Sequence, residues 1–116
     1  MKHLLLFSAI LIMIALWNSN IVLWAHVEKD GKTVFVEQKC TQCHSVETAN
    51  IEPTGKGKIT DLSNTGANHT EEFLVKYLQK LETIKQKKHA PTFKGTADDL
   101  TILGKWLSTL KVVKNK

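Results

Sequence analysis

A chain of 116 residues with a formal net charge of +5 is long enough for one domain and too short for two. Its basic side chains are spread along the sequence, and no aromatic residues interleave a basic cluster, so we expect no nucleic-acid interface. The Lys side chains are instead expected to solvate the surface and to steer docking with protein partners.

The first 25 residues have the pattern of a targeting segment. Lys2 and His3 precede an almost uninterrupted apolar run over residues 4–17, which is the order of a secretory signal. Cleavage after Ala25 would leave one domain, residues 26–116. Without cleavage, residues 4–25 are about as long as a bilayer is thick and would anchor the chain to the membrane. We therefore expect a periplasmic or otherwise extracytoplasmic domain, either free or membrane-anchored.

Residues 31–38 form the first predicted helix. Gly31 and Phe35 lie four residues apart and therefore share one face, which we expect to be buried. The helix leads directly into the only two cysteines of the chain.

The cysteines lie in the sequence C-T-Q-C-H at residues 40–44, which matches the C-x-x-C-H pattern of covalent haem attachment. Two thiols at this spacing can each add to one haem vinyl group, and the imidazole of the next residue can reach the iron. We therefore predict one haem c bound covalently by Cys40 and Cys43, with His44 as the proximal iron ligand.

Other readings of the same five residues explain less. A thioredoxin-type pair would require a preceding strand and a parallel sheet around it, and neither pattern is present. A zinc site would require further ligands at closer spacing than His69 and His89 provide. A disulfide would fit an oxidising compartment but would leave His44 unexplained.

Residues 45–68 are rich in Thr, Gly, Asn and Lys, which predicts a loop with Ile59 and Leu62 as its apolar contacts. Residues 70–84 follow with apolar side chains three and four apart, which predicts a helix with Thr70 as its N-cap. Its apolar face consists of Phe73, Leu74, Tyr77, Leu78 and Leu81. Residues 85–88 are interpreted as a solvated charged segment rather than as a dedicated partner surface.

The last predicted helix covers residues 96–111. Its Leu residues at 100, 103, 107 and 110 recur at helical spacing, and Thr96 is the expected N-cap. We expect this helix to pack across the first helix. Gly31 and Gly104 lack side chains and are candidates for a close crossing of the two terminal helices.

The order helix, C-x-x-C-H, loop, helix, H-A-P-T-F, helix resembles the class I monohaem cytochromes c over nearly all of residues 26–116. The resemblance implies an all-α fold in which the N- and C-terminal helices cross while a third helix and loops wrap one haem. It also implies an apolar haem pocket. The candidate pocket residues are Phe35, Ile59, Leu62, Phe73, Tyr77 and Phe93.

One departure from the family pattern concerns the proximal histidine. The family often has Gly-Pro-x-Leu in the haem loop, where the proline carbonyl orients this histidine. Here residues 59–62 read I-T-D-L, so the leucine matches and the proline is missing. The backbone carbonyl of Thr60 can still accept a hydrogen bond from Nδ1 of His44.

A second departure concerns the sixth iron ligand. The family usually supplies a Met shortly before the last helix, but Met1 and Met13 both lie in the leader. His89 stands at the matching place, and Pro91 stiffens its loop. The resemblance therefore points to His89 as the distal ligand, with His69, His26 or an open or water-bound position as the alternatives.

Iron bound by two imidazoles has no free position for oxygen or peroxide, yet it can still change its oxidation state. We therefore predict a carrier that shuttles single electrons between redox-partner proteins and is not an enzyme. Its potential should lie below that of a His/Met relative, because Met ligation raises the potential. The alternatives are a haem subunit of a larger oxidoreductase complex, or a gas-binding or peroxidase-like haem protein if the sixth position is open.

Overall fold

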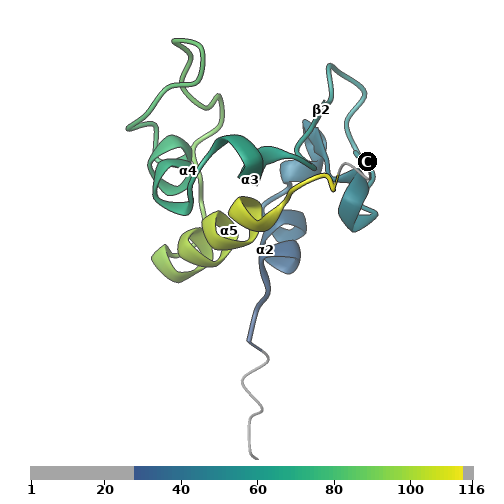
Figure 1. Ribbon diagram of the computed structural model, residues 1–116, viewed down its shortest axis with the longest axis horizontal. Coiled ribbons are helices and arrows are strands. Elements are labelled where there is room, and N and C mark those ends of the chain that lie inside the picture. Colours follow the sequence, from purple (N-terminus) through teal and green to yellow (C-terminus); the bar gives the residue numbers. More distant parts are fainter. Residues whose placement is uncertain (1–27, 114–116) are drawn as a thin grey trace, which may run out of the picture.

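The computed structural model describes residues 28–113 (Figure 1). Its helices are α2 (Gly31–Glu37), α3 (Thr65–Asn68), α4 (Glu71–Leu78) and α5 (Ala97–Thr109). Two 3₁₀ turns, η1 (Cys40–Gln42) and η2 (Glu47–Ala49), and two short strands, β1 (His44–Ser45) and β2 (Thr60–Asp61), lie between α2 and α3. The predicted targeting segment and His26 lie outside the described residues. Among residues 28–113, none of the helices has the length and hydropathy that crossing a membrane requires.

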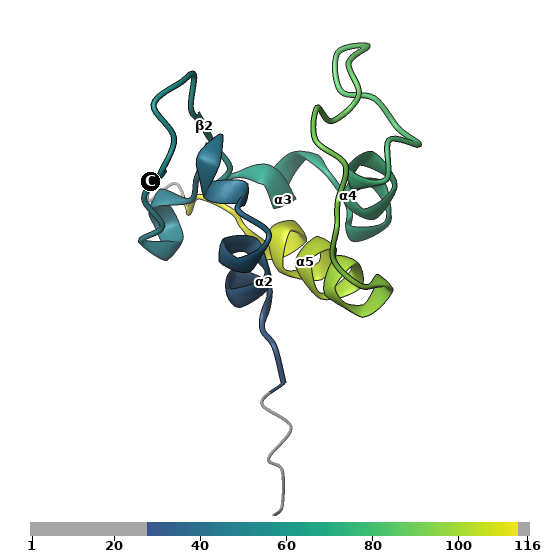
Figure 2. The ribbon, with the colours of Figure 1, turned by 180° about the vertical axis from the view of Figure 1, so that it is seen from behind.

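Helix α5 is the centre of the fold. It packs against α4, α2 and α3, as the two opposite views of the ribbon show (Figures 1 and 2). Its Leu side chains form most of one buried stripe, which confirms the predicted apolar face. The core consists of Val34, Phe35, Val46, Ile51, Leu74, Leu78, Leu100, Leu103, Leu107 and Leu110. The predicted all-α fold is therefore confirmed.

The two glycines that were expected at the crossing of the terminal helices lie in different contacts. Gly31 is buried against Trp106 of α5, where a Cβ atom would overlap with the indole side chain, so its predicted place is confirmed. Gly104 faces α4 instead, because a Cβ atom there would lie 2.6 Å from Cγ2 of Val75. The prediction for Gly104 is wrong because α5 is packed on more than one side.

Side chains cap the beginnings of the two longest helices as the sequence predicts. The hydroxyl of Thr70 accepts a hydrogen bond from the N–H of Phe73. At α5 the hydroxyl of Thr96 accepts from the N–H of Asp99, and the Asp99 carboxylate accepts from the N–H of Thr96. These bonds satisfy N–H groups that a helix cannot pair internally, and so fix where α4 and α5 begin.

Helix α4 ends at Leu78, although the apolar spacing predicted that it would continue to residue 84. Lys80 adopts a left-handed conformation with φ of 62°. Its N–H donates to the carbonyl of Tyr77, and the N–H of Leu81 donates to the carbonyl of Lys76. This pair of bonds is a Schellman motif, which terminates a helix. Leu81 therefore lies past the end of α4 and is 70% exposed.

The segment predicted as loop, residues 45–68, contains short regular elements. Strands β1 and β2 pair in parallel, with His44 opposite Thr60 and Ser45 opposite Asp61. Helix α3 lies against the end of α5, where the N–H of Gly66 donates to the carbonyl of Leu110. A Cβ atom on Gly66 would overlap with the carbonyl of Ser108. The prediction of an irregular loop is wrong here because contacts with α5, which leave no periodic pattern, stabilise this turn of helix.

Two loops extend on the same side of the molecule in both views, above α3 and α5 (Figures 1 and 2). One precedes β2, and the other follows α4 and leads to α5. His44 of the C-x-x-C-H motif pairs with Thr60 at the end of the first loop, and His89 belongs to the second loop.

Candidate functional site

The two cysteines follow α2 directly. The chain leaves the helix through Lys39, whose left-handed backbone has φ of 58°, and then enters η1. The N–H of Cys43 donates to the carbonyl of Cys40 at 3.1 Å, which closes a 3₁₀ turn. Side chains three residues apart in such a turn lie on the same side. Both thiols therefore face the same region.

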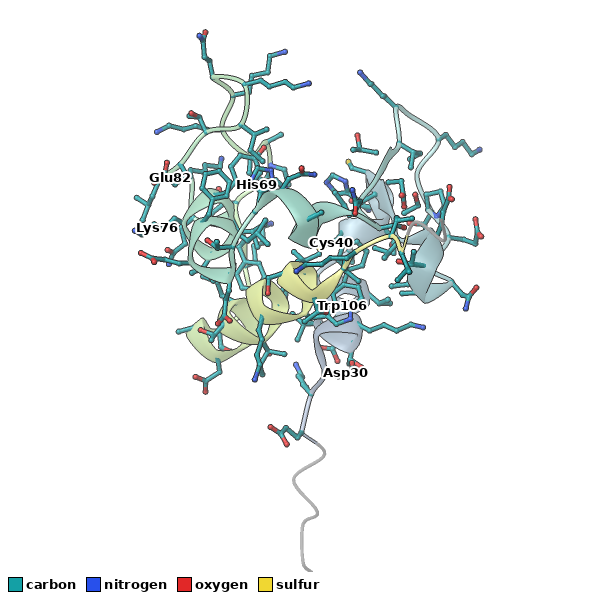
Figure 3. All side chains as sticks on the ribbon, in the orientation of Figure 1. Asp30, Cys40, His69, Lys76, Glu82 and Trp106 are labelled. Atoms are coloured by element: carbon teal, nitrogen blue, oxygen red, sulfur yellow. The ribbon has the colours of Figure 1, made fainter. Side chains whose placement is uncertain are left out.

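The loop before β2 holds this turn in place. The N–H of Thr54 donates to the carbonyl of Thr41 at 2.8 Å, and the hydroxyls of these two residues lie 3.1 Å apart. Gly55 passes so close that a Cβ atom would overlap with the carbonyl oxygen of Gln42. Figure 3 labels Cys40 on the α2 side of the molecule, above α5.

The environment of Cys40 differs from that of a redox-active cysteine pair. Burial raises the pKa of the Cys40 thiol to about 11; the neighbouring Cys43 acts in the same direction, and a backbone hydrogen bond opposes them. Thioredoxin-type motifs require the opposite shift, because their chemistry uses the thiolate. In the part of the chain that the structure describes, Cys40 and Cys43 are not joined in a disulfide.

The half-buried His44 lies in β1 beside Thr60 of β2. Its Nδ1 lies 3.2 Å from the carbonyl oxygen of Thr60, so the predicted hydrogen bond is present. Since a carbonyl oxygen can only accept, Nδ1 carries the proton and Nε2 keeps its lone pair. Burial lowers the pKa of His44; the Thr60 carbonyl opposes this shift, and the nearby His89 adds to it. The neutral imidazole is the form that binds a metal.

The carboxylate of Asp61 fixes the strand that carries the Thr60 carbonyl. Its Oδ1 accepts hydrogen bonds from the hydroxyl of Ser45, the N–H of Glu47 and the hydroxyl of Ser63. Its Oδ2 accepts from the N–H of Ser63. The role of Asp61 was not predicted from the sequence, although Asp followed two residues later by Ser is a common turn signal.

His89 lies in the loop that follows α4, and its ring lies near that of His44. The two ring centroids are 6.3 Å apart, and the ring planes are inclined by 16°. A metal–imidazole bond is about 2 Å long, so two imidazoles that bind one metal from opposite sides have centroids about 6 Å apart. The observed centroid separation matches this distance, so it fits one metal ion bound by both imidazoles.

A backbone carbonyl also fixes the tautomer of His89. Its Nδ1 lies 3.0 Å from the carbonyl oxygen of Pro91, so Nδ1 donates and Nε2 is left for a metal. Pro91 was expected only to stiffen the loop, and this hydrogen bond was not predicted from the sequence. Both histidines thus have the same arrangement, with Nδ1 paired to a carbonyl, which is the usual setting of a metal-binding imidazole.

Three side chains form an aromatic row along α4 that reaches His89. The Tyr77 ring meets His89 edge-on, with centroids 5.5 Å apart and planes inclined by 71°. Phe73 stacks on Tyr77 at 6.2 Å, and His69 stacks on Phe73 at 4.7 Å. His69 thus occupies the end of the row away from His89, beside the start of α4 (Figure 3).

The other candidate pocket residues lie in different surroundings. Phe35 is buried between α2 and α5, with its ring 5.6 Å from that of Trp106. Leu62 and Phe93 are half-buried and pack against the core. Ile59 is half-buried immediately before β2. Phe93 also lines a pocket with Leu78 and Leu100, at the start of α5.

A conventional metal site of protein ligands is not found among residues 28–113, because no three His, Cys, Asp or Glu side chains come together there. The zinc alternative therefore has no support from the described residues. A haem requires fewer protein ligands, since the porphyrin supplies four nitrogens and the protein supplies the axial ligands.

Comparison with known families agrees with this geometry. The family model described as Cytochrome c matches residues 28–109, which include every residue of the site. Comparisons with curated proteins and with solved structures gave no significant match. Members of this family bind covalently attached haem c and serve in electron transfer, and the C-x-x-C-H spacing is present here. The chain therefore belongs to the cytochrome c family and is a c-type haem electron carrier.

Proposed function

We propose that this protein carries single electrons between redox proteins outside the cytoplasm, with its haem iron ligated by His44 and His89. The observation that carries the proposal is the neighbouring pair of imidazoles, with centroids 6.3 Å apart, nearly parallel planes and each Nδ1 paired to a backbone carbonyl. The haem, when bound, supplies a one-electron iron couple.

The proposed ligand pair determines what chemistry the protein can perform. Two protein nitrogens, one from each side, leave no iron position open to oxygen, peroxide or a substrate. His44 and His89 bind as neutral imidazoles in both oxidation states, so little has to rearrange when an electron is transferred. This ligand set favours a carrier over an enzyme.

The proposed ligand pair also lowers the redox potential of the haem relative to a His/Met pair. A thioether ligand raises the potential of a c-type haem, and residues 28–113 include no Met. The carbonyls of Thr60 and Pro91 increase the electron donation of the two imidazoles, because each accepts a hydrogen bond from an Nδ1–H group. We therefore expect a potential below that of a relative with His/Met ligation.

The surface near the site is suited to an acidic redox partner, and this proposal replaces the interpretation of residues 85–88 as a solvated segment without a partner. The loop before β2 carries the exposed residues Lys56 and Lys58, and the loop after α4 carries the exposed residues Lys85, Lys87 and Lys88. Both loops extend on the same side of the molecule (Figure 2). Such a charge distribution steers association and makes its rate sensitive to salt. The targeting pattern of residues 1–25 supports an extracytoplasmic location, either free or anchored.

Optical and magnetic spectroscopy of the purified full-length haem protein tests the ligand pair. We expect low-spin iron in both oxidation states and no prompt spectral change when carbon monoxide is added to the reduced protein. His89→Ala should convert the ferric iron to a high-spin or water-bound form and allow rapid carbon monoxide binding.

His69→Ala is the matched control, because it removes a second half-buried histidine, which lies at the other end of the aromatic row. It should leave the low-spin spectrum intact. An unchanged spectrum in His89→Ala, or loss of the low-spin signal in His69→Ala, would contradict the proposal. Prompt carbon monoxide binding by the unaltered protein would favour a gas-binding haem.

A further inference from the structure

The loop that holds His89 lies against α4, where His89 meets the ring of Tyr77. Residues 79–88 between α4 and His89 are mostly exposed and contain three left-handed residues, Lys80, Lys85 and Gln86. The hydrogen bond from His89 to Pro91 lies within the same loop, so it moves with the loop. Tyr77 belongs to α4, which packs on α5, and its ring contacts the imidazole of His89 directly.

Tyr77 is itself held in position by its neighbours. Phe73 lies one turn earlier, with a ring plane inclined by only 8° to that of Tyr77, and His69 stacks on Phe73 at an inclination of 13°. The three rings are nearly parallel, and all three side chains are half-buried. The row therefore places the Tyr77 ring against His89 in a T-shaped arrangement, from a helix that packs on α5.

We infer that Tyr77 is a positioning residue that sets the rotation of the His89 imidazole plane and keeps it nearly parallel to the plane of His44. An edge-on aromatic contact is directional, because the positive ring edge favours the face of its neighbour. Rotation of His89 away from the observed 16° inclination would disturb this contact. The inference rests on the proposed function, since it concerns the same iron ligands.

The orientation of two axial imidazoles has a spectroscopic signature that is independent of electron-transfer activity. In low-spin ferric haem, parallel imidazole planes separate the energies of the two iron orbitals that interact with the ligand π systems. Perpendicular planes leave these orbitals close in energy, and the largest g value of the electron paramagnetic resonance spectrum then rises. The unaltered protein should give the rhombic low-spin spectrum of parallel planes.

Substitutions of Tyr77 test the inference in the full-length haem protein. Tyr77→Phe keeps the ring and should leave the g values unchanged. Tyr77→Leu removes the ring edge and should raise the largest g value and broaden the signal, while the optical spectrum stays low-spin. Unchanged g values in Tyr77→Leu, or an equal shift in both variants, would overturn the role of the ring.

A substitution of Phe73 tests the same inference if Tyr77→Leu yields no low-spin protein. Phe73→Leu leaves Tyr77 in place but removes the ring that stacks on it, and should shift the largest g value in the same direction by a smaller amount. No shift in Phe73→Leu would then overturn the inference. High-spin iron in the unaltered protein would refute the proposed ligand pair, whereas a low-spin spectrum typical of perpendicular planes would refute the positioning role alone.

Discussion

Gly31 in α2 lies directly against Trp106 in α5, so that a Cβ atom at position 31 would overlap with the Cβ and Cγ atoms of the indole side chain. The carbonyl oxygen of Ile102 would lie 3.1 Å from the same Cβ atom. One turn later in α2, the ring of Phe35 packs on Trp106. The N- and C-terminal helices thus meet where one of them has no side chain, and this contact positions the segment that carries the cysteines.

Gly31→Ala should destabilise the protein. In a helix Ala is intrinsically favoured over Gly by roughly 0.5–1 kcal/mol. The overlap with Trp106 involves atoms close to the backbone, and forcing an extra methyl group into a packed contact costs roughly 1–3 kcal/mol. The steric cost is the larger of the two, so denaturant unfolding followed by circular dichroism should show a lower free energy of unfolding.

Gly57→Ala is the control for this substitution, because a Cβ atom at position 57 meets nothing within 4 Å. Its free energy of unfolding should stay within about 0.5 kcal/mol of the unaltered value. Equal stability of the Gly31→Ala and Gly57→Ala variants would contradict a close crossing of α2 and α5.

Asp61→Asn should lower the free energy of unfolding at neutral pH and should lower it much less in acid. Partial burial alone would raise the pKa of Asp61, but the hydrogen bonds from Glu47, Ser63 and Ser45 outweigh it and the net pKa is lowered. The ionised carboxylate therefore stabilises the fold fully above about pH 4, the ordinary carboxyl pKa. This contribution is lost as the pH falls through the lower pKa of the folded state.

Urea unfolding of the unaltered protein and of Asp61→Asn at several pH values measures this contribution. The difference between their free energies of unfolding should be largest at neutral pH and should shrink as the pH falls below the ordinary carboxyl pKa of about 4. Glu52→Gln, which alters an exposed carboxylate in the neighbouring loop, should show no such trend. If the free energies of unfolding of the unaltered protein and of Asp61→Asn differ by the same amount at every pH, the role given to the carboxylate is contradicted.

Lys80→Gly should stabilise the protein by roughly 1 kcal/mol, because a left-handed backbone costs about that much for a residue with a Cβ atom and nothing for Gly. The φ of 62° at Lys80 belongs to the Schellman motif that ends α4. Thr83→Gly, at a position without positive φ, should give no gain. Thermal unfolding of both variants provides the comparison, and equal melting temperatures would show that Lys80 is not strained.

The parts of the fold that the sequence predicts are those determined by local patterns. The caps at Thr70 and Thr96 and the Leu stripe of α5 depend on residues within a few positions of one another, and all are confirmed. The end of α4 was missed because Leu81 continues the apolar spacing, while the Schellman motif is built by Lys80 without the usual Gly. Helix α3 and the packing of Gly104 on Val75 were missed because they depend on contacts between distant segments.

In the candidate site, too, the features set by local sequence were predicted and those set by distant contacts were not. The motif at residues 40–44 and the place of His89 before the last helix can be read from the chain, and so can the Thr60 carbonyl beside His44. The hydrogen bond from His89 to the carbonyl of Pro91 and the T-shaped contact with Tyr77 depend on how the loop after α4 folds back. No spacing rule predicts that path, because the loop turns through left-handed residues that are not Gly.

Cys40→Ser and Cys43→Ser should each leave the haem attached through a single thioether. A vinyl group that has not reacted stays conjugated with the porphyrin, so the α band of the pyridine haemochrome should move to longer wavelength in each single variant. In the double variant the haem should be extracted by acidified organic solvent, because only coordination retains it. Gln42→Ala, which changes an exposed residue of the same turn, should keep both the band position and the resistance to extraction. Haem that stays covalently bound in the double variant would show that attachment involves another residue.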